Sequence, residues 1–262
     1  MSATTDAERS RLPAAPYLLS APALLLYVVL LLVPLVATAL LSLHSFGIYK
    51  GIENVYNLAN YRDIFGDSYF YEIFGRTFRI AFLVTLLAAA IGAPEAYILN
   101  RMRAPWRGIF LLVALGIIAE PLQFMYSETG VIIALTHVLI PLMVISVWAS
   151  LQRLDPQIEN AAISLGAAAP TVLRRIVLPQ AMPGILSGGI IVFALAASAF
   201  ATPAIIGGRR LKVAATLAYD EFLNTLNWPL GAAIAILLLI ANIVIIVGCN
   251  RLLERRYAEV FR

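Results

Sequence analysis

This sequence contains very little charge and almost no cysteine. Only 13% of its 262 residues are Asp, Glu, Lys or Arg, and 61% are hydrophobic, whereas soluble domains average about 25% charged and about 45–50% apolar residues. This composition excludes a soluble globular fold and indicates an integral membrane protein. The single cysteine, Cys249, excludes an internal disulfide framework, and we expect it to be a small apolar filler in a membrane segment.

Motifs for nucleotide binding and for hydrolysis are also absent. No Gly-Lys dipeptide occurs, so the chain lacks a phosphate-binding P-loop. Neither His-Glu-x-x-His nor Gly-x-Ser-x-Gly occurs, and the two histidines, His44 and His137, have no Cys or acidic ligands nearby in sequence. We therefore expect no catalytic site, no metal site and no cofactor bound by this chain.

The basic residues form no patch of the kind that binds nucleic acid. The formal net charge is only +4, and the Lys and Arg residues lie at the edges of apolar segments. Nucleic acid is therefore not an expected partner. Near the start of the chain, Arg9 and Arg11 precede an uncharged stretch from Leu12 to Tyr49. That stretch is too long for the hydrophobic region of a signal peptide, about 7–15 residues, so we expect it to be retained as a membrane span.

Long apolar segments are what the sequence has in abundance. A helix that spans a bilayer needs about 20 mostly apolar residues, and six segments meet this requirement. They predict an all-α, polytopic membrane protein forming a single domain over residues 1–262. The third segment is interrupted by Glu120-Pro121. The expected spans are Tyr17–Leu43, Ile73–Leu99, Gly108–Met125, Thr129–Leu151, Gly184–Ile206 and Pro229–Gly248.

The distribution of Lys and Arg between the connecting segments predicts the orientation of the spans. If the N-terminus is cytoplasmic, twelve basic residues fall in cytoplasmic segments and seven in external ones. Cytoplasmic loops carry the excess of Lys and Arg in membrane proteins. We therefore expect a multi-pass protein of the bilayer with both termini in the cytoplasm, which agrees with an even number of spans.

The loop at about residues 152–184, between the fourth and fifth spans, is patterned beyond what a simple connection needs. Asp155-Pro156 predicts a helix start, because Asp is a favoured N-cap and Pro a favoured first helical residue. Small residues follow, which let another surface approach closely. Pro170 predicts a break before a second short helix at about residues 171–177. Pro179 and Pro183 are then expected to turn the chain back into the membrane.

The spacing within this loop resembles the coupling loop of binding-protein-dependent ABC transporter permeases. That motif runs Glu-Ala-Ala, three residues, Gly, nine residues, Ile, one residue, Leu-Pro. The motif glutamate falls on Asn160, and a glutamate stands one residue earlier, at Glu159. The other six positions agree with the motif and are Ala161, Ala162, Gly166, Ile176, Leu178 and Pro179.

The resemblance implies a transport subunit of the bacterial inner membrane with no catalytic activity of its own. The coupling-loop residues from Glu159 to Pro179 are expected to dock on an ABC ATPase subunit, which would use ATP on behalf of this chain. A second permease subunit, identical or different, and a periplasmic solute-binding protein are the other expected partners. An ordinary amphipathic linker is the alternative reading of the loop.

Other segments resemble the spermidine/putrescine type within this family. They are Asn60-Tyr61, Arg76-Thr77 at the start of the second span, and the stretch Pro94-Glu95-Ala96-Tyr97. The chain departs from that type between residues 117 and 131, where it is shorter.

Three residues are candidates for the substrate path at the external side. Glu120 and Glu128 are acidic, Tyr126 lies between them, and no Lys or Arg occurs between Arg107 and Arg153. Unpaired carboxylates and an aromatic ring favour a cationic solute such as a polyamine. The alternative is that Glu128 is solvated and Glu120 only stabilises a kink at Pro121.

Two other classes of function compete with an ATP-driven importer. A secondary transporter would need no ATPase, but such proteins are commonly built from internal repeats, and no repeat is visible here. An intramembrane enzyme would need a nucleophile and a base, for which the sequence offers no candidate pair. Copurification of an ATPase would separate the first reading from both others.

Overall fold

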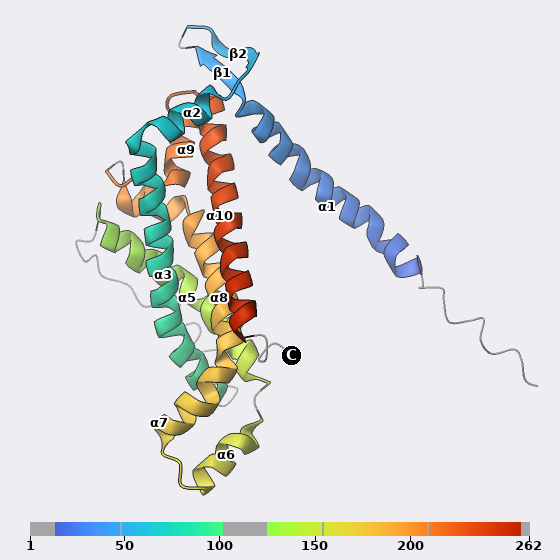
Figure 1. Cartoon of the computed structure of the whole chain (residues 1–262), viewed down its shortest axis with the longest axis vertical. Helices are drawn as coiled ribbons and strands as arrows, with labels where there is room; N and C mark the ends of the chain where they lie inside the picture. The colour runs from blue at the N-terminus through green and yellow to red at the C-terminus, as the bar shows by residue number, and fades with distance from the viewer. Residues whose placement is uncertain (1–13, 48, 102–124, 154, 209, 258–262) are drawn as a thin grey trace, which may run out of the picture.

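The computed structural model describes residues 14–47, 49–101, 125–153, 155–208 and 210–257. Most of these residues are helical (Figure 1). Five of the described helical segments are long and apolar enough to cross a membrane. They are α1 (Ala14–Leu41), α3 (Ser68–Arg101), α5 (Glu128–Leu151), the segment Ala169–Ala197 and α10 (Trp228–Tyr257).

Four of these segments confirm predicted spans, namely the first, second, fourth and sixth. Helix α3 begins five residues before the predicted Ile73, because its first turns lie outside the apolar stretch. It ends two residues after the predicted Leu99. The predicted third span, Gly108–Met125, falls almost wholly on residues 102–124 and so lies outside the described residues. The membrane-spanning, largely helical fold is the one that the composition predicts.

The fifth span differs from its prediction at both ends. One helical run continues from Ala169 to Ala197 through α7 (Ala169–Val172), a π-helical turn η1 (Leu173–Val177) and α8 (Leu178–Ala197). The prediction that Pro179 and Pro183 turn the chain was therefore wrong. Pro179 lies in the first turn of α8, directly after the π-helical turn, and the helical run continues through it and through Pro183. The run ends at Ala197, before the predicted Ile206, and a second π-helical turn η2 follows at Pro203–Gly207.

A short hairpin, which the sequence analysis did not predict, interrupts the all-helical pattern. Strand β1 (His44–Gly47) pairs antiparallel with β2 (Gly51–Tyr56), and Gly51 adopts a φ of +71° beside the tight connection. Helix α2 (Ala59–Gly66) follows. We call the end of the molecule that carries this hairpin the hairpin end, and the opposite end, which carries α6 (Pro156–Ser164) and α7, the loop end (Figure 1).

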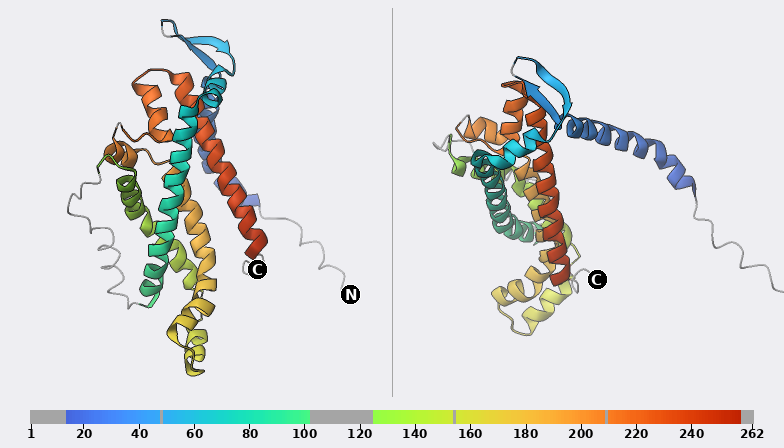
Figure 2. Two further views of the ribbon diagram at one scale, coloured as in Figure 1. Left: turned by 60° about the vertical axis from the view of Figure 1, so that its left-hand side comes forward. Right: turned by 45° about the horizontal axis from the view of Figure 1, so that its top comes forward.

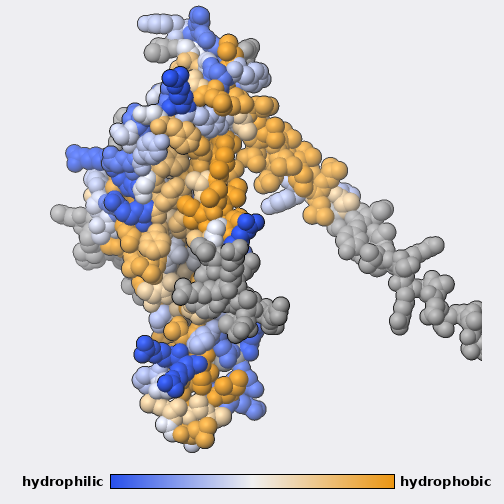
Figure 3. Space-filling model, in the orientation of Figure 1, coloured by the Kyte–Doolittle hydropathy of each residue, from blue (hydrophilic) through white to orange (hydrophobic). Residues whose placement is uncertain are grey.

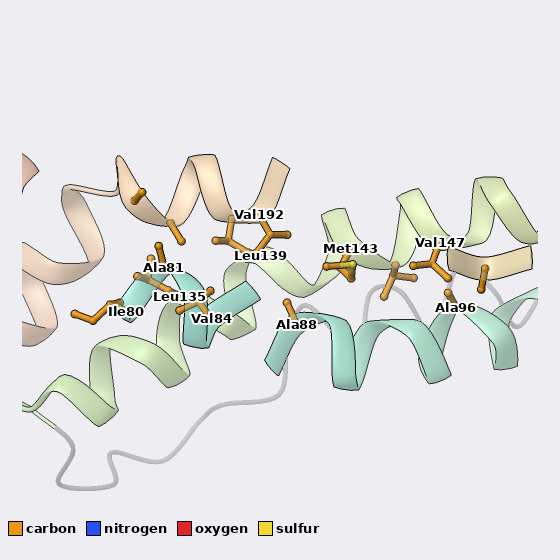
Figure 4. Packing of buried hydrophobic residues seen from close by; sticks show 14 of the residues in the cluster. Ile80, Ala81, Val84, Ala88, Ala96, Leu135, Leu139, Met143, Val147 and Val192 are labelled. Atoms are coloured by element: carbon orange, nitrogen blue, oxygen red, sulfur yellow. The ribbon is translucent and has the colours of Figure 1, made fainter. Parts of the chain in front are cut away.

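Helices α3, α5 and α8 pack side by side and form the main core (Figure 4). Small residues allow their close approach. A Cβ atom at Gly184 of α8 would stand 2.6 Å from the Ser146 backbone oxygen and 2.7 Å from the Val147 Cα of α5, and one at Gly188 would stand 2.9 Å from the Met143 sulfur. Such small-residue contacts are how membrane helices gain packing energy without a hydrophobic driving force.

Helix α10 packs against α9 (Ala214–Leu223) in a second cluster at the hairpin end. By contrast, α1 leaves the body of the molecule and extends away from it (Figures 1 and 2). None of its apolar span from Ala21 to Leu41 is buried. Helix α1 therefore presents apolar side chains on all sides, which in this fold must meet lipid or another chain.

Candidate functional site

The coupling loop begins with a capped helix, as its sequence predicts. Asp155 is the N-cap of α6, and its Oδ1 accepts a hydrogen bond of 2.9 Å from the Gln157 backbone N–H. Pro156 occupies the first turn. The cap satisfies one of the N–H groups that a helix start leaves without a partner.

Gly166 ends this helix through its backbone conformation. Its φ is +83°, and the Gly166 N–H donates to Ile163 O (2.9 Å) while the Ala167 N–H donates to Ala162 O (3.0 Å). This pair of bonds is a Schellman motif, in which a glycine after the last helical turn satisfies the final carbonyl groups. No atom lies within 4 Å of a Cβ placed there, so the constraint at Gly166 is the backbone and not the space around it.

The remaining motif positions divide between the inside and the outside of the loop. Ala162 and Ile176 are half-buried and pack against the main core. Ala161, Leu178 and Pro179 are exposed. The motif spacing therefore fixes two different surfaces, one that joins the loop to the bundle and one that faces outward.

Glu159 and Asn160 point in different directions. Glu159 is only 8% exposed and forms an ion pair with Arg101 at the end of α3, whereas Asn160 is exposed. Successive helical residues are rotated by about 100°, so neighbours cannot share one face. The carboxylate beside the motif position is thus turned into the molecule.

The tip of the loop end carries large apolar side chains that the sequence analysis missed. Leu165 is 89% exposed, and Ile158 and Ile163 are about half exposed. The space-filling view shows an apolar area at this tip with hydrophilic residues just above it (Figure 3). The motif leaves these three positions undefined, and the available signal was that apolar residues recur in a helix lying outside every predicted span.

At the hairpin end, Tyr126 has a constrained position before α5. Its φ is +65°, its backbone N–H donates to Ile206 O (2.6 Å), and its ring lies against Gly208. A side chain at Gly208 would meet the ring at 2.7 Å. Tyr126 is therefore fixed by the η2 turn, although its side chain is exposed.

Glu128 has a partner, so the prediction that it is unpaired was wrong. Arg79 of α3 donates from Nε to Oε1 (2.9 Å) and from Nη2 to Oε2 (2.5 Å) of Glu128. The two residues are 49 positions apart, and a search for bases near Glu128 in sequence therefore missed the pair. Glu120, the other predicted acid, lies outside the described residues.

A second polar site, not predicted from the sequence, lies beside η2 and α9. Lys212 Nζ stands 2.8 Å from Asp220 Oδ2, and the rings of Phe200 and Tyr219 pack with their centres 4.4 Å apart. These four residues line a cavity of about 150 Å³. The hydrogen bond to Asp220 raises the pKa of Lys212, so the Lys212 ammonium is charged at neutral pH.

The start of α3 holds this site in place. The Thr77 hydroxyl accepts a hydrogen bond of 2.9 Å from the Ala214 N–H, and Arg76 Nη1 donates to Lys212 O (3.2 Å). Asn60 likewise anchors α2, because its amide donates to the backbone oxygens of Ser42 and His44, both at 2.9 Å. The Arg76-Thr77 and Asn60-Tyr61 dipeptides therefore have structural roles at the hairpin end.

Two apolar grooves run along α10. They have volumes of about 320 and 350 Å³. Helices α2 and α3 line the first groove opposite α10, and α3 and α8 line the second. Within the described ranges, no three His, Cys, Asp or Glu side chains gather closely enough to hold a metal ion. The chemistry available at the two ends is thus apolar contact, ion pairing and aromatic contact.

Known permeases resemble this chain over most of its length. The spermidine/putrescine transport system permease protein PotB of Salmonella typhimurium (strain LT2) is 28% identical, over 80% of this chain and 84% of that protein. PotB of Escherichia coli (strain K12) is 29% identical, over 72% and 80% respectively. The molybdenum transport system permease protein ModB of Mycobacterium tuberculosis (strain ATCC 25618 / H37Rv) is 29% identical, over 63% and 72%.

Solved structures share the fold. A chain of a bacterial ABC transporter involved in the import of the acidic polysaccharide alginate aligns with a TM-score of 0.72 at 15% identity, covering 92% of this chain and 95% of that one. The alginate transporter in complex with its alginate pentasaccharide-bound periplasmic protein gives a TM-score of 0.69, covering 93% and 94%. The family model of the binding-protein-dependent transport system inner membrane component matches residues 14–259, which is nearly the whole chain. With its patterned loop and its helical bundle, this chain belongs to that family of transport permeases.

Proposed function

We propose that this chain is the transmembrane subunit of an ATP-driven importer for a polyamine or a related organic cation. The observation that carries the solute class is the similarity to spermidine/putrescine permeases over 80% of the chain. ATP hydrolysis belongs to a partner ABC ATPase, and this chain is the non-catalytic, cofactor-free path through the bilayer.

The loop end is the proposed ATPase-docking surface. Exposed apolar patches outside the membrane mark sites of protein–protein contact, and the tip formed by Ile158, Ile163 and Leu165 is such a patch. Arg174 and Arg175, in η1 of the same loop, are also exposed. Apolar anchors with a charged rim are the composition expected of a specific interface.

The excess of Lys and Arg supports a cytoplasmic loop end. This charge distribution favours a coupling loop and two termini on the cytoplasmic side of a bacterial inner membrane. The hairpin end then faces the periplasm, where a solute-binding protein docks. Helix α1, whose apolar span has no buried residue, and the apolar grooves beside α10 suit contact with lipid and with a second permease subunit, which is the same chain or a different one.

The substrate path is proposed to open at the hairpin end, past Tyr126 and the cavity beside Asp220. Aromatic faces and carboxylates bind organic cations through charge and cation–π contact. Glu128 contributes less than an unpaired acid would, because Arg79 neutralises it. The place of Glu120 in this path remains a proposal from the sequence.

A molybdenum importer is the second candidate. ModB is as similar in identity, at 29%, although the match covers only 63% of this chain. The two candidates differ in the charge of the solute, so a transport assay separates them.

Uptake by intact cells and purification of the tagged chain test this proposal together. We expect purification from host membranes to recover an ATPase with a P-loop and a second permease. Deletion of the gene should abolish uptake of labelled spermidine or putrescine and leave molybdate uptake unchanged. Loss of molybdate uptake alone would favour the second candidate, and purification without an ATPase would overturn the proposed class.

A further inference from the structure

The inference concerns how the coupling loop is joined to the membrane helices, and it rests on the proposed function. Helix α6 lies at the tip of the loop end, and many of its side chains are exposed. Its buried charged residue is Glu159. The partner of Glu159 is Arg101, the last described residue of α3, which lies 58 residues earlier in the chain.

The surroundings of this ion pair favour a fixed geometry. A buried carboxylate is stable only when a partner compensates its lost hydration, and Arg101 supplies that partner. The Arg101 guanidinium also lies over the ring of Tyr97, one helical turn earlier, with its Cζ 4.7 Å from the ring centre. This cation–π contact orients the arginine toward α6.

Glu159 does not replace the motif glutamate on the outer surface. Related loops carry glutamate at the position of Asn160, which is exposed here. The neighbouring carboxylate is turned away from that surface by the helical rotation and is used inside the molecule. The docking face therefore presents a neutral amide, and the charge serves a contact within the chain.

Helix α3 connects this ion pair to the hairpin end. It continues from Ser68 to Arg101, and Arg101 lies 22 positions after Arg79, which corresponds to about 33 Å of helix. At its other end, Thr77 binds the Ala214 N–H and Arg79 binds Glu128. One helix thus contacts the coupling loop through Arg101 at one end and contacts Ala214 and Glu128 at the hairpin end.

We propose that the Arg101–Glu159 pair is the positioning contact through which movement of α6 reaches α3 and the hairpin end. Glu159 and Arg101 act through α3 and do not touch solute or nucleotide. Breaking the pair would leave α6 docked on the ATPase but joined to the bundle only by apolar packing such as that of Ala162, and therefore more weakly coupled to α3. ATP would then be hydrolysed without a matching movement of the membrane helices.

The test uses the complete transporter, reconstituted in proteoliposomes with its ATPase, second permease and solute-binding protein. The variants are Arg101→Glu, Glu159→Arg, the double swap and the near-isosteric Glu159→Gln. The readouts are copurified ATPase, import of labelled spermidine, and the ratio of ATP hydrolysed to spermidine imported. The ratio separates lost coupling from lost folding, because a misfolded permease would lower both activities together.

We expect each single reversal to raise the ratio about tenfold or more, with the ATPase still copurifying, and the double swap to restore most of the coupling. Glu159→Gln should also raise the ratio. It replaces the single reversals as the test if a reversed charge prevents insertion of the chain into the membrane. A parental ratio in Glu159→Gln, or a double swap no better than the single reversals, would overturn the inference. If the parent chain itself recovers no ATPase, the proposed function fails and the inference fails with it.

Discussion

The two ends of this protein are specified in different ways. The loop end is built from a local stretch that contains a capped helix, the Gly166 turn and an outward apolar tip. The hairpin end is built from pairs far apart in sequence, such as Arg79 with Glu128 and Thr77 with Ala214. A surface for a partner can therefore be read from a motif, whereas a solute path requires the fold.

The largest effect is expected in the core that both ends share. Gly184→Ala places a methyl group 2.6 Å from the Ser146 backbone oxygen and should separate α5 from α8. We expect a loss of about 3 kcal/mol of stability, or failure to fold. Gly189→Ala is the matched control, because its nearest neighbour, Thr85 Cγ2, is 3.6 Å away. Equal unfolding temperatures for the two variants in detergent would contradict this packing account.

The next largest effect would remove the proposed ATPase docking at the loop end and spare the fold. Leu165→Asp changes a side chain that is 89% exposed, so stability should not fall. We expect ATPase copurification to weaken by about 30-fold, as for a central apolar anchor of an interface. Tyr49→Asp, at a fully exposed position of the hairpin end, should leave it unchanged. Normal ATPase recovery with Leu165→Asp would place the docking surface elsewhere.

Substitutions at Gly166 separate backbone strain from docking. Its φ of +83° means that any L-residue costs about 1–2 kcal/mol there. Gly166→Ala should therefore lower stability by that amount but retain import, while Gly166→Arg should abolish import through its bulk and charge. Thermal unfolding and uptake measured on both variants decide the question. Parental import by Gly166→Arg would contradict docking at this position.

A smaller effect is expected from Glu128→Gln at the hairpin end. The Arg79–Glu128 pair is partly exposed, so its loss should cost no more than about 1 kcal/mol. Uptake of a cationic solute should be retained, because the charge of Glu128 is already neutralised. A large loss of uptake by a stable variant would show that Glu128 binds the solute directly.

The smallest effect concerns pH. The hydrogen bond to Asp220 raises the pKa of Lys212 above its ordinary value of about 10.4. The contribution of the pair is thus fully present below that ordinary value and is lost only as pH rises through the raised pKa. Lys212→Met should therefore lower the unfolding temperature equally at pH 7 and pH 9. A difference that shrinks by pH 9 would contradict the raised pKa.

Much of the fold could be predicted from hydropathy, because a membrane span must be long and apolar. The helical continuation through Pro179 and Pro183 could not, since a proline within a helix removes a backbone hydrogen bond and usually marks a break. The hairpin was missed because His44–Gly47 and Gly51–Tyr56 are short and lack a strand-like alternation.

The two candidate sites were predictable to different degrees, because a sequence motif does not show contacts between different helices. The motif spacing located the coupling loop, but it did not reveal that Glu159 faces Arg101, because the partner lies on another helix. At the hairpin end, Glu128 was identified and its arginine was not. The cavity beside η2 was not recognised, because only the fold brings Lys212 and Asp220 together with Phe200 and Tyr219.

One measurement tests the central claim that this chain is a path driven by an ATPase docked at its loop end. Proteoliposomes containing the complete transporter are loaded with ATP or with a non-hydrolysable analogue, and uptake of labelled spermidine is followed. The account predicts uptake with ATP, none with the analogue, and strongly reduced uptake with ATP when the chain carries Leu165→Asp. Spermidine uptake that persists without ATP hydrolysis would contradict the account and indicate a secondary transporter.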